Sequence, residues 1–283
     1  MNSTTVGVVG AGTMGSGIAY VCASAGLSVR LLDISPQMLE KAAATLDKHL
    51  ERQVAKGMLD QAQKLQVLCR VQMSTDYTCL QGVDMAIEAA TERLALKREV
   101  LSRVAGEVSA HCVIASNTSS LSITELATPL PNPERFIGVH FFNPVPVMQL
   151  VEVVRGLRTA DATYARVLTL AAQLNKVCIS SANRPGFVVN RILVPMINEA
   201  IMVYQEGIAS AKDIDAAMVL GSNQPLGPLA LADLIGLDTV LAILQSLYDG
   251  FNDSKYRPAT LLKELVAAGD LGRKTGRGFH GYD

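Results

Sequence analysis

The start of the chain alternates short apolar runs with glycine-rich turns. An apolar run at 6–9 precedes a glycine-rich turn, a helix-like stretch to about residue 25 and a second apolar run that ends at Asp33. Short apolar runs bounded by turn residues are typical of buried strands, whereas the longer stretch has the length of a helix. The pattern predicts strand, turn, helix and strand, in that order.

This alternation continues through the middle of the chain. A long helical stretch runs from Pro36 to about Lys56, and another helix is predicted at 92–109. Further strands are predicted at 71–74, 84–89, 112–116, 135–142 and 149–154. A mostly parallel sheet with helices on its faces requires such alternation. The predicted fold class is an α/β, Rossmann-type doubly wound sheet.

After about residue 185 the alternation stops and helical periods dominate. Helices are predicted at about 187–206, 210–220, 228–250 and 258–268. The boundary is expected near Asn183–Pro185. We therefore expect a Rossmann-type domain at 1–184 and an all-α C-terminal domain at 185–283.

The first glycine-rich turn has the spacing of a dinucleotide-binding fingerprint. Gly10, Gly12 and Gly15 follow the strand and open the helix, and Asp33 ends the next strand. In that motif the glycines allow a tight turn, close approach of a pyrophosphate and close helix–strand packing, while the acid accepts bonds from the adenosine ribose. The helix N-terminus attracts the phosphates. A turn without a ligand and a flavin site are the alternatives, and NAD is the favoured cofactor.

An imidazole and a carboxylate interrupt the apolar stretch GVHFFNPVPVMQLVEVV at 138–154. His140 lies near the end of one predicted strand and Glu152 within the next. Burying either side chain alone is costly, so we expect neighbouring strands to pair them. A carboxylate on one ring nitrogen fixes the tautomer and favours the charged imidazole, so that the other nitrogen can take a proton. Oxidation of an alcohol by a nicotinamide needs such a base, and a buried pair without chemistry is the alternative.

Several polar residues are candidates for contacts with ligands. The segment SNTSSLSI at 116–123 follows a predicted strand, where loops form ligand sites, although such clusters are commonly turns and helix caps. Asn190 stands among apolar residues, either as a capping amide or as a donor to a substrate oxygen. The expected cofactor contacts in turns and loops include Thr13, Met14, Asn117 and Asn143.

Three basic residues recur every four positions in the long helical stretch. Lys48, Arg52 and Lys56 therefore lie on one helix face. The strip is either an ordinary solvated face or a site for an anionic ligand.

Composition narrows the classes of function. The chain is 49% apolar and 18% charged with a net charge of −1, which lacks the basic field of a nucleic-acid-binding protein. Five scattered cysteines fit a reducing, cytoplasmic setting. Four histidines without a ligand motif predict no bound metal. Residues 6–29 carry no charge but hold six glycines, so we expect neither a membrane span nor a signal peptide.

Taken together, these motifs resemble the L-3-hydroxyacyl-CoA dehydrogenase family, in particular its short bacterial 3-hydroxybutyryl-CoA dehydrogenases. The resemblance runs along essentially the whole chain. It rests on GAGTMGSGIA, ASNTSSLSIT, GVHFFNPVPVMQLVEVVRG, PGFVVNRILVPMINEA, QEGIAS, GPLALADLIGLDT and GRKTGRGF. Ordered matches of this length are far more specific than any single motif.

The resemblance implies a role for each candidate residue. His140 is the catalytic base, Glu152 orients it, Ser119 bonds the 3-hydroxyl group, and Asn190 contacts the thioester side of the substrate. Two further residues in AATERLALK match cofactor-contacting positions: Glu92 and Lys97. The basic strip matches the place where family members meet the CoA phosphates, although close relatives carry a further lysine where this chain has Met58.

The implied activity is NAD(H)-dependent interconversion of (S)-3-hydroxybutyryl-CoA, or another short-chain 3-hydroxyacyl-CoA, with acetoacetyl-CoA. The family fold further implies a homodimer formed through the C-terminal helical domain. The alternatives are a related dehydrogenase of 3-hydroxyadipyl-CoA or a sugar acid, and a non-catalytic, crystallin-like member. Retention of Ser119, His140, Glu152 and Asn190 argues against lost chemistry.

Overall fold

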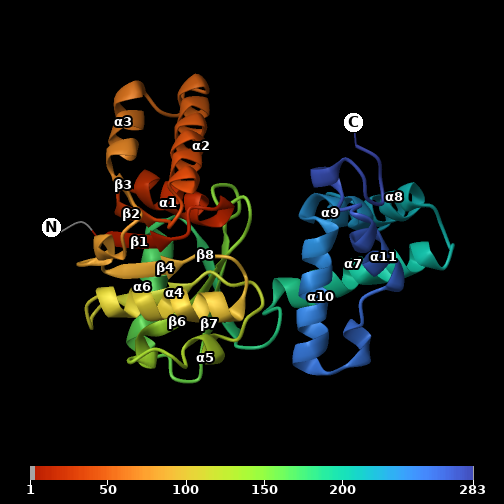
Figure 1. Cartoon of the computed structure of the whole chain (residues 1–283). Helices are drawn as coiled ribbons and strands as arrows, with labels where there is room; N and C mark the ends of the chain where they lie inside the picture. Colours follow the sequence, from red (N-terminus) through yellow and green to blue (C-terminus); the bar gives the residue numbers. More distant parts are fainter. Residues whose placement is uncertain (1–3, 283) are drawn as a thin grey trace. The chain divides into compact units, whose positions relative to one another are not determined.

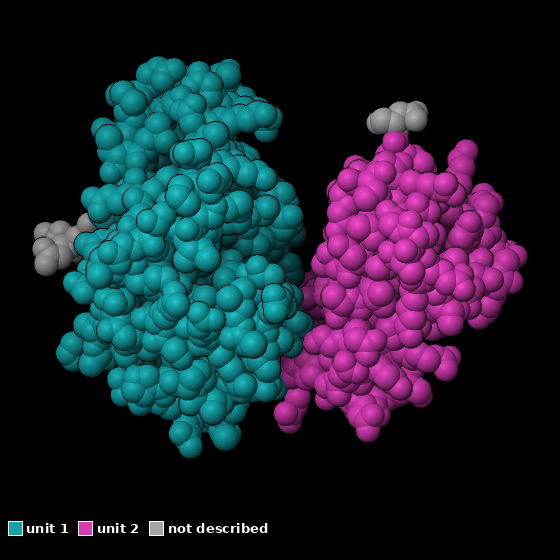
Figure 2. All heavy atoms as spheres, viewed as in Figure 1, with its two compact units in different colours: residues 1–183 teal, residues 184–283 magenta. Residues whose placement is uncertain are grey.

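The structure is a computed structural model that describes residues 4–282. The chain divides into two compact units, Met1–Asn183 and Arg184–Asp283 (Figure 2). This division falls one residue before the boundary expected from the sequence.

Unit 1 is built on one eight-stranded sheet with the order β3-β2-β1-β4-β5-β6-β7-β8 (Figure 1). Its strands are β1 (Thr5–Val9), β2 (Ser28–Leu32), β3 (Val71–Ser74), β4 (Met85–Glu88), β5 (Val113–Ser116), β6 (Phe136–Phe141), β7 (Leu150–Arg155) and β8 (Val177–Ala182). All neighbouring pairs run parallel except β6 and β7. The crossovers reverse between β1 and β4, which makes the carboxyl ends of these two strands the switch point where such sheets bind ligands.

Helices cover both faces of the sheet. They are α1 (Thr13–Ser24), α2 (Pro36–Ala55), α3 (Gln61–Cys69), α4 (Leu94–Glu107), α5 (Ile123–Leu126) and α6 (Asp161–Gln173), with short 3₁₀ turns η1 (Tyr77–Leu80) and η2 (Pro133–Arg135). Helices α1, α2, α3 and α6 share one core with alternate strand residues, among them Ile137 and Val139. Gly138 between them faces α5, where an added Cβ would lie 2.5 Å from the Ile123 side chain. Coverage of both faces explains the uninterrupted apolar strands.

The long helix α2 begins where its sequence signals predict. Ser35 is the N-cap residue, and its side chain accepts from the Met38 N–H; Pro36 takes the first helical position. Helices α2 and α3 pack together as a hairpin that extends from the sheet (Figure 1). Lys64 of α3 bridges to Asp47 and Glu51 of α2.

Unit 2 is helical. Its elements are α7 (Val189–Gln205), α8 (Ala211–Ser222), α9 (Pro228–Ile235), α10 (Leu237–Phe251), η3 (Ser254–Tyr256), α11 (Thr260–Ala268) and η4 (Arg273–Thr275). Their apolar faces form one core that includes Ile197, Leu229, Leu244 and Leu262. Within the described residues, no single helix is long and apolar enough to cross a membrane; α9 and α10 pass that test only together, as a pair bent by 98°.

The prediction of a single helix at 228–250 is wrong. The chain breaks at Gly236, whose φ of 99° no helix accommodates, and α9 and α10 are separate helices. An added Cβ at Gly236 would lie 2.6 Å from the Lys274 Nζ, so the break also receives a side chain from the tail. Apolar periodicity continues across the break, which is why the pattern alone did not reveal it.

Candidate active site

The glycine-rich turn lies at the switch point between β1 and β4. Gly10 has a φ of 102°, and a Cβ there would lie 2.8 Å from the Ala89 carbonyl oxygen that follows β4. A Cβ at Gly15 would lie 1.7 Å from the Gly10 carbonyl oxygen. Gly12 has no atom within 4 Å of an added Cβ and therefore borders open space. Two of the glycines are thus required by the protein's own packing, while the third leaves room for a ligand.

Asp33 ties the second strand to this turn. Its Oδ2 accepts from the Ala11 N–H at 2.7 Å, and its Oδ1 accepts from the Ser35 N–H at 2.9 Å. The only cation of the β2 strand, Arg30, is held elsewhere, because its Nη1 donates to the carbonyls of Cys79 and Gln81 at 2.6 Å each. The carboxylate therefore faces the turn without that guanidinium beside it.

The residues present fit a dinucleotide. Helix α1 has Gly12 as its N-cap residue, with no side-chain cap and no acidic residue in its first turn, so its N–H groups can receive a phosphate. Thr13 is exposed and Met14 partly exposed at this end of the helix. A carboxylate at the end of β2 is placed to accept from ribose hydroxyls.

His140 and Glu152 form the pair that the sequence predicts. They stand opposite each other in the antiparallel register of β6 and β7, and His140 Nδ1 lies 2.7 Å from Glu152 Oε2. The two residues are 7% and 0% exposed. The His140 ring also packs against Phe142, with centroids 4.4 Å apart. The carboxylate therefore favours a proton on Nδ1 and fixes the orientation of the ring.

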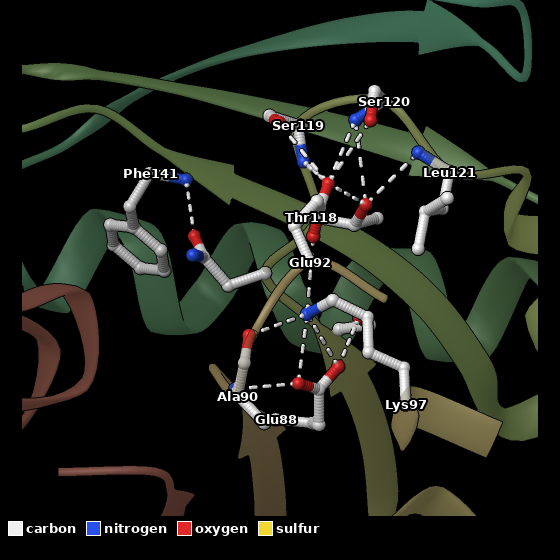
Figure 3. Close-up of polar contacts among 11 residues, drawn as sticks. Glu88, Ala90, Glu92, Lys97, Thr118, Ser119, Ser120, Leu121 and Phe141 are labelled. Atoms are coloured by element: carbon white, nitrogen blue, oxygen red, sulfur yellow. Dashed lines mark hydrogen bonds and ion pairs between the residues drawn. The ribbon is translucent and has the colours of Figure 1, made fainter. Parts of the chain in front are cut away.

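A second buried carboxylate ends β4. Glu88 accepts from the Lys97 Nζ at 2.8 and 3.1 Å, from the Ser116 hydroxyl at 2.5 Å and from the Ala90 N–H at 2.6 Å (Figure 3). Both charged side chains are completely buried. Burial raises the pKa of the Glu88 carboxyl, against the pull of the Lys97 ammonium.

Lys97 connects this pair to the loop after β5. Its Nζ lies 3.4 Å from Glu92 Oε2 and also donates to the Ala90 carbonyl. Glu92 Oε1 in turn accepts from the Thr118 hydroxyl at 2.6 Å, from the Ser119 N–H at 2.8 Å and from the Ser120 N–H at 3.2 Å (Figure 3). Burial opposes the ionisation of Glu92, but Lys97 and the loop donors outweigh it, so the pKa of the Glu92 carboxyl lies below its usual value.

The candidate cofactor residues Asn117 and Asn143 lie on the same edge of the sheet. The Asn117 side-chain Oδ1 accepts from the Phe141 N–H at 3.0 Å, which joins the end of β5 to the residue after His140 (Figure 3). Asn143 lines a pocket of about 260 Å³ together with Gly12 and Thr13.

That pocket runs between one face of α1 and one face of α2. Its α2 wall includes Lys41, Thr45 and His49, three polar residues that the sequence analysis did not single out. Their recurrence every four positions was a usable signal, since it places them on one helix face. The exposed basic strip continues this face, because Arg52 and Lys56 follow His49 at helical spacing.

Models for two family domains match the chain almost end to end. The 3-hydroxyacyl-CoA dehydrogenase NAD-binding domain matches residues 5–184, and the C-terminal domain of the same family matches residues 186–282. The chain belongs to the 3-hydroxyacyl-CoA dehydrogenase family. The resemblance predicted from the sequence is confirmed, and this family member is an NAD-dependent dehydrogenase.

Individual relatives cover 98% or more of the chain. The 3-hydroxybutyryl-CoA dehydrogenase of Bradyrhizobium diazoefficiens is 48% identical over 277 residues, which is 98% of this chain and 94% of that protein. The crystal structure of (S)-3-hydroxybutyryl-CoA dehydrogenase from Ralstonia eutropha matches with a TM-score of 0.96 at 55% identity over 100% of both chains. The 3-hydroxyadipyl-CoA dehydrogenase of Escherichia coli is 40% identical over 283 residues, covering 100% of this chain and 60% of that protein. The predicted fold class is confirmed by these matches.

The dehydrogenase geometry separates the candidate residues into groups. Unit 1 brings together the glycine turn with Asp33, the His140–Glu152 pair, and the network from Lys97 to Ser119. Asn190 belongs to unit 2, in the first turn of α7. The expected contact of Lys97 with the cofactor stays a prediction. In the structure the Lys97 ammonium donates to the Glu88 carboxylate and to the Ala90 carbonyl oxygen.

The Lys97–Glu88 pair yields a prediction about stability. Lys97→Met leaves the Glu88 carboxylate buried without its charge partner, so the free energy of unfolding should fall by about 3–5 kcal/mol. Urea denaturation of this variant, beside exposed Lys212→Met as a control, measures the effect. The double variant Glu88→Gln/Lys97→Met should recover part of the loss, because Gln still accepts the Ala90 N–H. A loss no larger than that of Lys212→Met would contradict this account.

Proposed function

We propose that this enzyme interconverts (S)-3-hydroxybutyryl-CoA, or another short-chain 3-hydroxyacyl-CoA, and acetoacetyl-CoA with NAD(H). The observation that carries the proposal is the buried His140–Glu152 pair on the sheet edge that holds the nucleotide turn. Two relatives with 48% identity are named 3-hydroxybutyryl-CoA dehydrogenase, and the match covers 94% or more of the length of each.

In this proposal His140 moves the hydroxyl proton. Its Nε2 takes the proton during oxidation and returns it during reduction, while Nδ1–H remains bonded to Glu152. The Glu152 carboxylate stabilises the imidazolium that forms and keeps the ring in one orientation. The bound nicotinamide supplies the hydride chemistry at the carbinol carbon.

Ser119 and Asn190 orient the substrate. The Ser119 hydroxyl bonds the 3-oxygen, and Asn190 donates to the thioester side. Support for Ser119 comes from its loop. Glu92 Oε1 accepts hydrogen bonds from the Ser119 N–H at 2.8 Å and from the Ser119 hydroxyl at 3.1 Å. A hydroxyl held on a fixed loop loses little entropy when it meets the substrate.

The CoA portion is assigned to the pocket between α1 and α2 and to the basic strip beyond it. The pocket begins at Gly12 and Asn143, near the nucleotide turn, and its α2 wall continues into Lys48, Arg52 and Lys56. These three side chains are exposed and can reach phosphate groups.

We further assign dimer formation to unit 2 and a cytoplasmic location to the protein. Large apolar side chains are exposed on unit 2, with Ile192 at 67%, Ile208 at 66% and Leu220 at 85%. All five cysteines are free thiols, which suits a reducing compartment.

A substrate panel decides the function. NADH oxidation is measured with acetoacetyl-CoA, with longer 3-ketoacyl-CoA esters and with 3-ketoadipyl-CoA. The proposal expects the highest kcat/KM with acetoacetyl-CoA. A clear preference for 3-ketoadipyl-CoA would favour the activity named for the Escherichia coli relative, and no turnover with any CoA ester would overturn the proposal.

Replacing the base tests the mechanism. His140→Gln should lower kcat by about 10²- to 10⁴-fold, the range for a positioned acid–base group. NADH binding, followed by fluorescence, should remain close to wild type because the glycine turn is separate from this pair. Retention of more than half of the wild-type rate would remove His140 from the mechanism.

Reversing the basic strip tests the CoA site. The triple change of Lys48, Arg52 and Lys56 to Glu should raise KM for acetoacetyl-CoA, most strongly at low salt, because exposed charges are screened at high salt. KM for NADH should not change. Reversal of Lys212, Lys255 and Lys263, three exposed lysines of unit 2, makes the same change in net charge and serves as the control. Equal effects on both ligands would point to general misfolding.

Asp33 predicts the choice of cofactor. Its carboxylate would repel the 2′-phosphate of NADP, and Arg30 is already held by two backbone carbonyls. We expect kcat/KM to favour NADH over NADPH by at least about tenfold, which needs only about 1.4 kcal/mol. Asp33→Ala with Ile34→Arg should narrow or invert the ratio, whereas Asp33→Asn, which keeps an acceptor for Ala11, controls for the turn. Equal efficiency with NADPH in the unchanged protein would show that Asp33 does not face the ribose.

A further inference from the structure

The loop that carries Ser119 is held at both of its ends. Glu92 binds its first part, through Thr118, Ser119 and Ser120. Its last part, where the loop enters α5, is bound by a side chain that is distant in sequence. This second attachment comes from Asn183, the last residue of unit 1.

Asn183 uses every polar group of its side chain on three consecutive residues. Its Oδ1 accepts from the Ile123 N–H at 2.9 Å, across a separation of 60 residues. Its Nδ2 donates to the Ser122 hydroxyl oxygen at 3.1 Å and to the Thr124 hydroxyl oxygen at 3.0 Å. The amide therefore fixes the start of α5 through one acceptor and two donors.

The three residues that Asn183 binds make further contacts with α5, with β6 and with the segment after β7. The Ser122 hydroxyl caps α5, and the Thr124 hydroxyl accepts from the Leu157 N–H at 2.9 Å. Ile123 is completely buried, and only glycine fits beneath it, since a Cβ at Gly138 would lie 2.5 Å from its side chain. Displacing this point would thus move the end of the Ser119 loop relative to β6, the strand that carries His140.

We propose that Asn183 is a positioning residue for the proposed reaction, acting through the loop that holds Ser119. The inference rests on the proposed function, because it assigns Ser119 to the reacting oxygen. The chain leaves unit 1 at Asn183, and Asn190 follows seven residues later. The Asn183 side chain therefore joins two segments. One is the segment that leads to Asn190, and the other is the loop that carries Ser119.

Asn183→Ala removes the clamp and leaves the Ile123 N–H without this acceptor. A shift of about 1 Å in a positioning element can lower the rate about 10²-fold, so we expect kcat/KM for acetoacetyl-CoA to fall about 10- to 100-fold. The loss should appear mainly in kcat, because the bond of Ser119 to the reacting oxygen strengthens in the transition state. The dissociation constant of NADH should stay at its wild-type value, since Asp33 holds the glycine turn by its own bonds.

Two further variants separate positioning from general stability. Asn183→Asp keeps the acceptor for Ile123, and both hydroxyls can rotate to donate to its carboxylate, so this variant should restore most of kcat. Gln205→Ala is the matched control in unit 2, because the Gln205 amide oxygen likewise binds the start of a helix, accepting from the Leu261 N–H and the Thr260 hydroxyl at 2.8 Å each. It should lower thermal stability and leave kcat unchanged.

Hydrogen exchange gives a readout that does not depend on turnover. The amides of 119–123 should exchange faster in Asn183→Ala than in wild type and Asn183→Asp. If wild type does not act on CoA esters, the proposed function fails, yet this measurement still decides whether Asn183 orders the loop. Wild-type kcat together with wild-type exchange in Asn183→Ala would overturn the inference, as would a kcat loss that Gln205→Ala shares.

Discussion

A carboxylate taken out of water needs a partner, and two such carboxylates organise the active site of unit 1. Glu88 ends β4 and Glu152 lies within β7 of the same sheet, and the two residues are 1% and 0% exposed. The Lys97 ammonium is the partner of the first, and His140 Nδ1 is hydrogen-bonded to the second. Since an unpaired buried charge is strongly unfavourable, the docking of α4 and the register of β6 against β7 must satisfy both pairs together. The need to pair these two carboxylates thus constrains the site in addition to apolar packing.

Most polar side chains of the site form hydrogen bonds with other groups of the protein. Glu92 receives the loop after β5, Asn117 joins that loop to β6, and Asp33 supports the glycine turn. Groups fixed in this way need not reorganise when charge develops on a substrate, which is the physical basis of electrostatic preorganisation. His140 and Ser119, the residues proposed to meet the substrate, are held by such groups, namely Glu152 and Glu92.

The sequence was informative wherever partners are close along the chain or a motif has a fixed spacing. The turn with Asp33, and His140 opposite Glu152, follow from short-range patterns, and only one hairpin connection separates β6 from β7. It was uninformative where partners are distant. The attachment of Asn183 to Ile123 spans 60 residues, and no periodicity encodes it. Strand β8 was missed because its residues alternate irregularly between partial burial and exposure at the edge of the sheet.

Glycine-rich segments at the two ends of the chain show what distinguishes a ligand site from a structural contact. In the tail, a Cβ at Gly278 would lie 1.9 Å from Asp233 Oδ1, and that carboxylate accepts the N–H groups of Phe279 and His280. At the first turn, glycine is needed equally for close approach, but α1 begins with no side-chain cap on its N–H groups. The glycine pattern is therefore common to both segments, and the hydrogen bonding of the neighbouring N–H groups distinguishes them. In the tail these groups donate to Asp233, whereas at the start of α1 they are available to a phosphate.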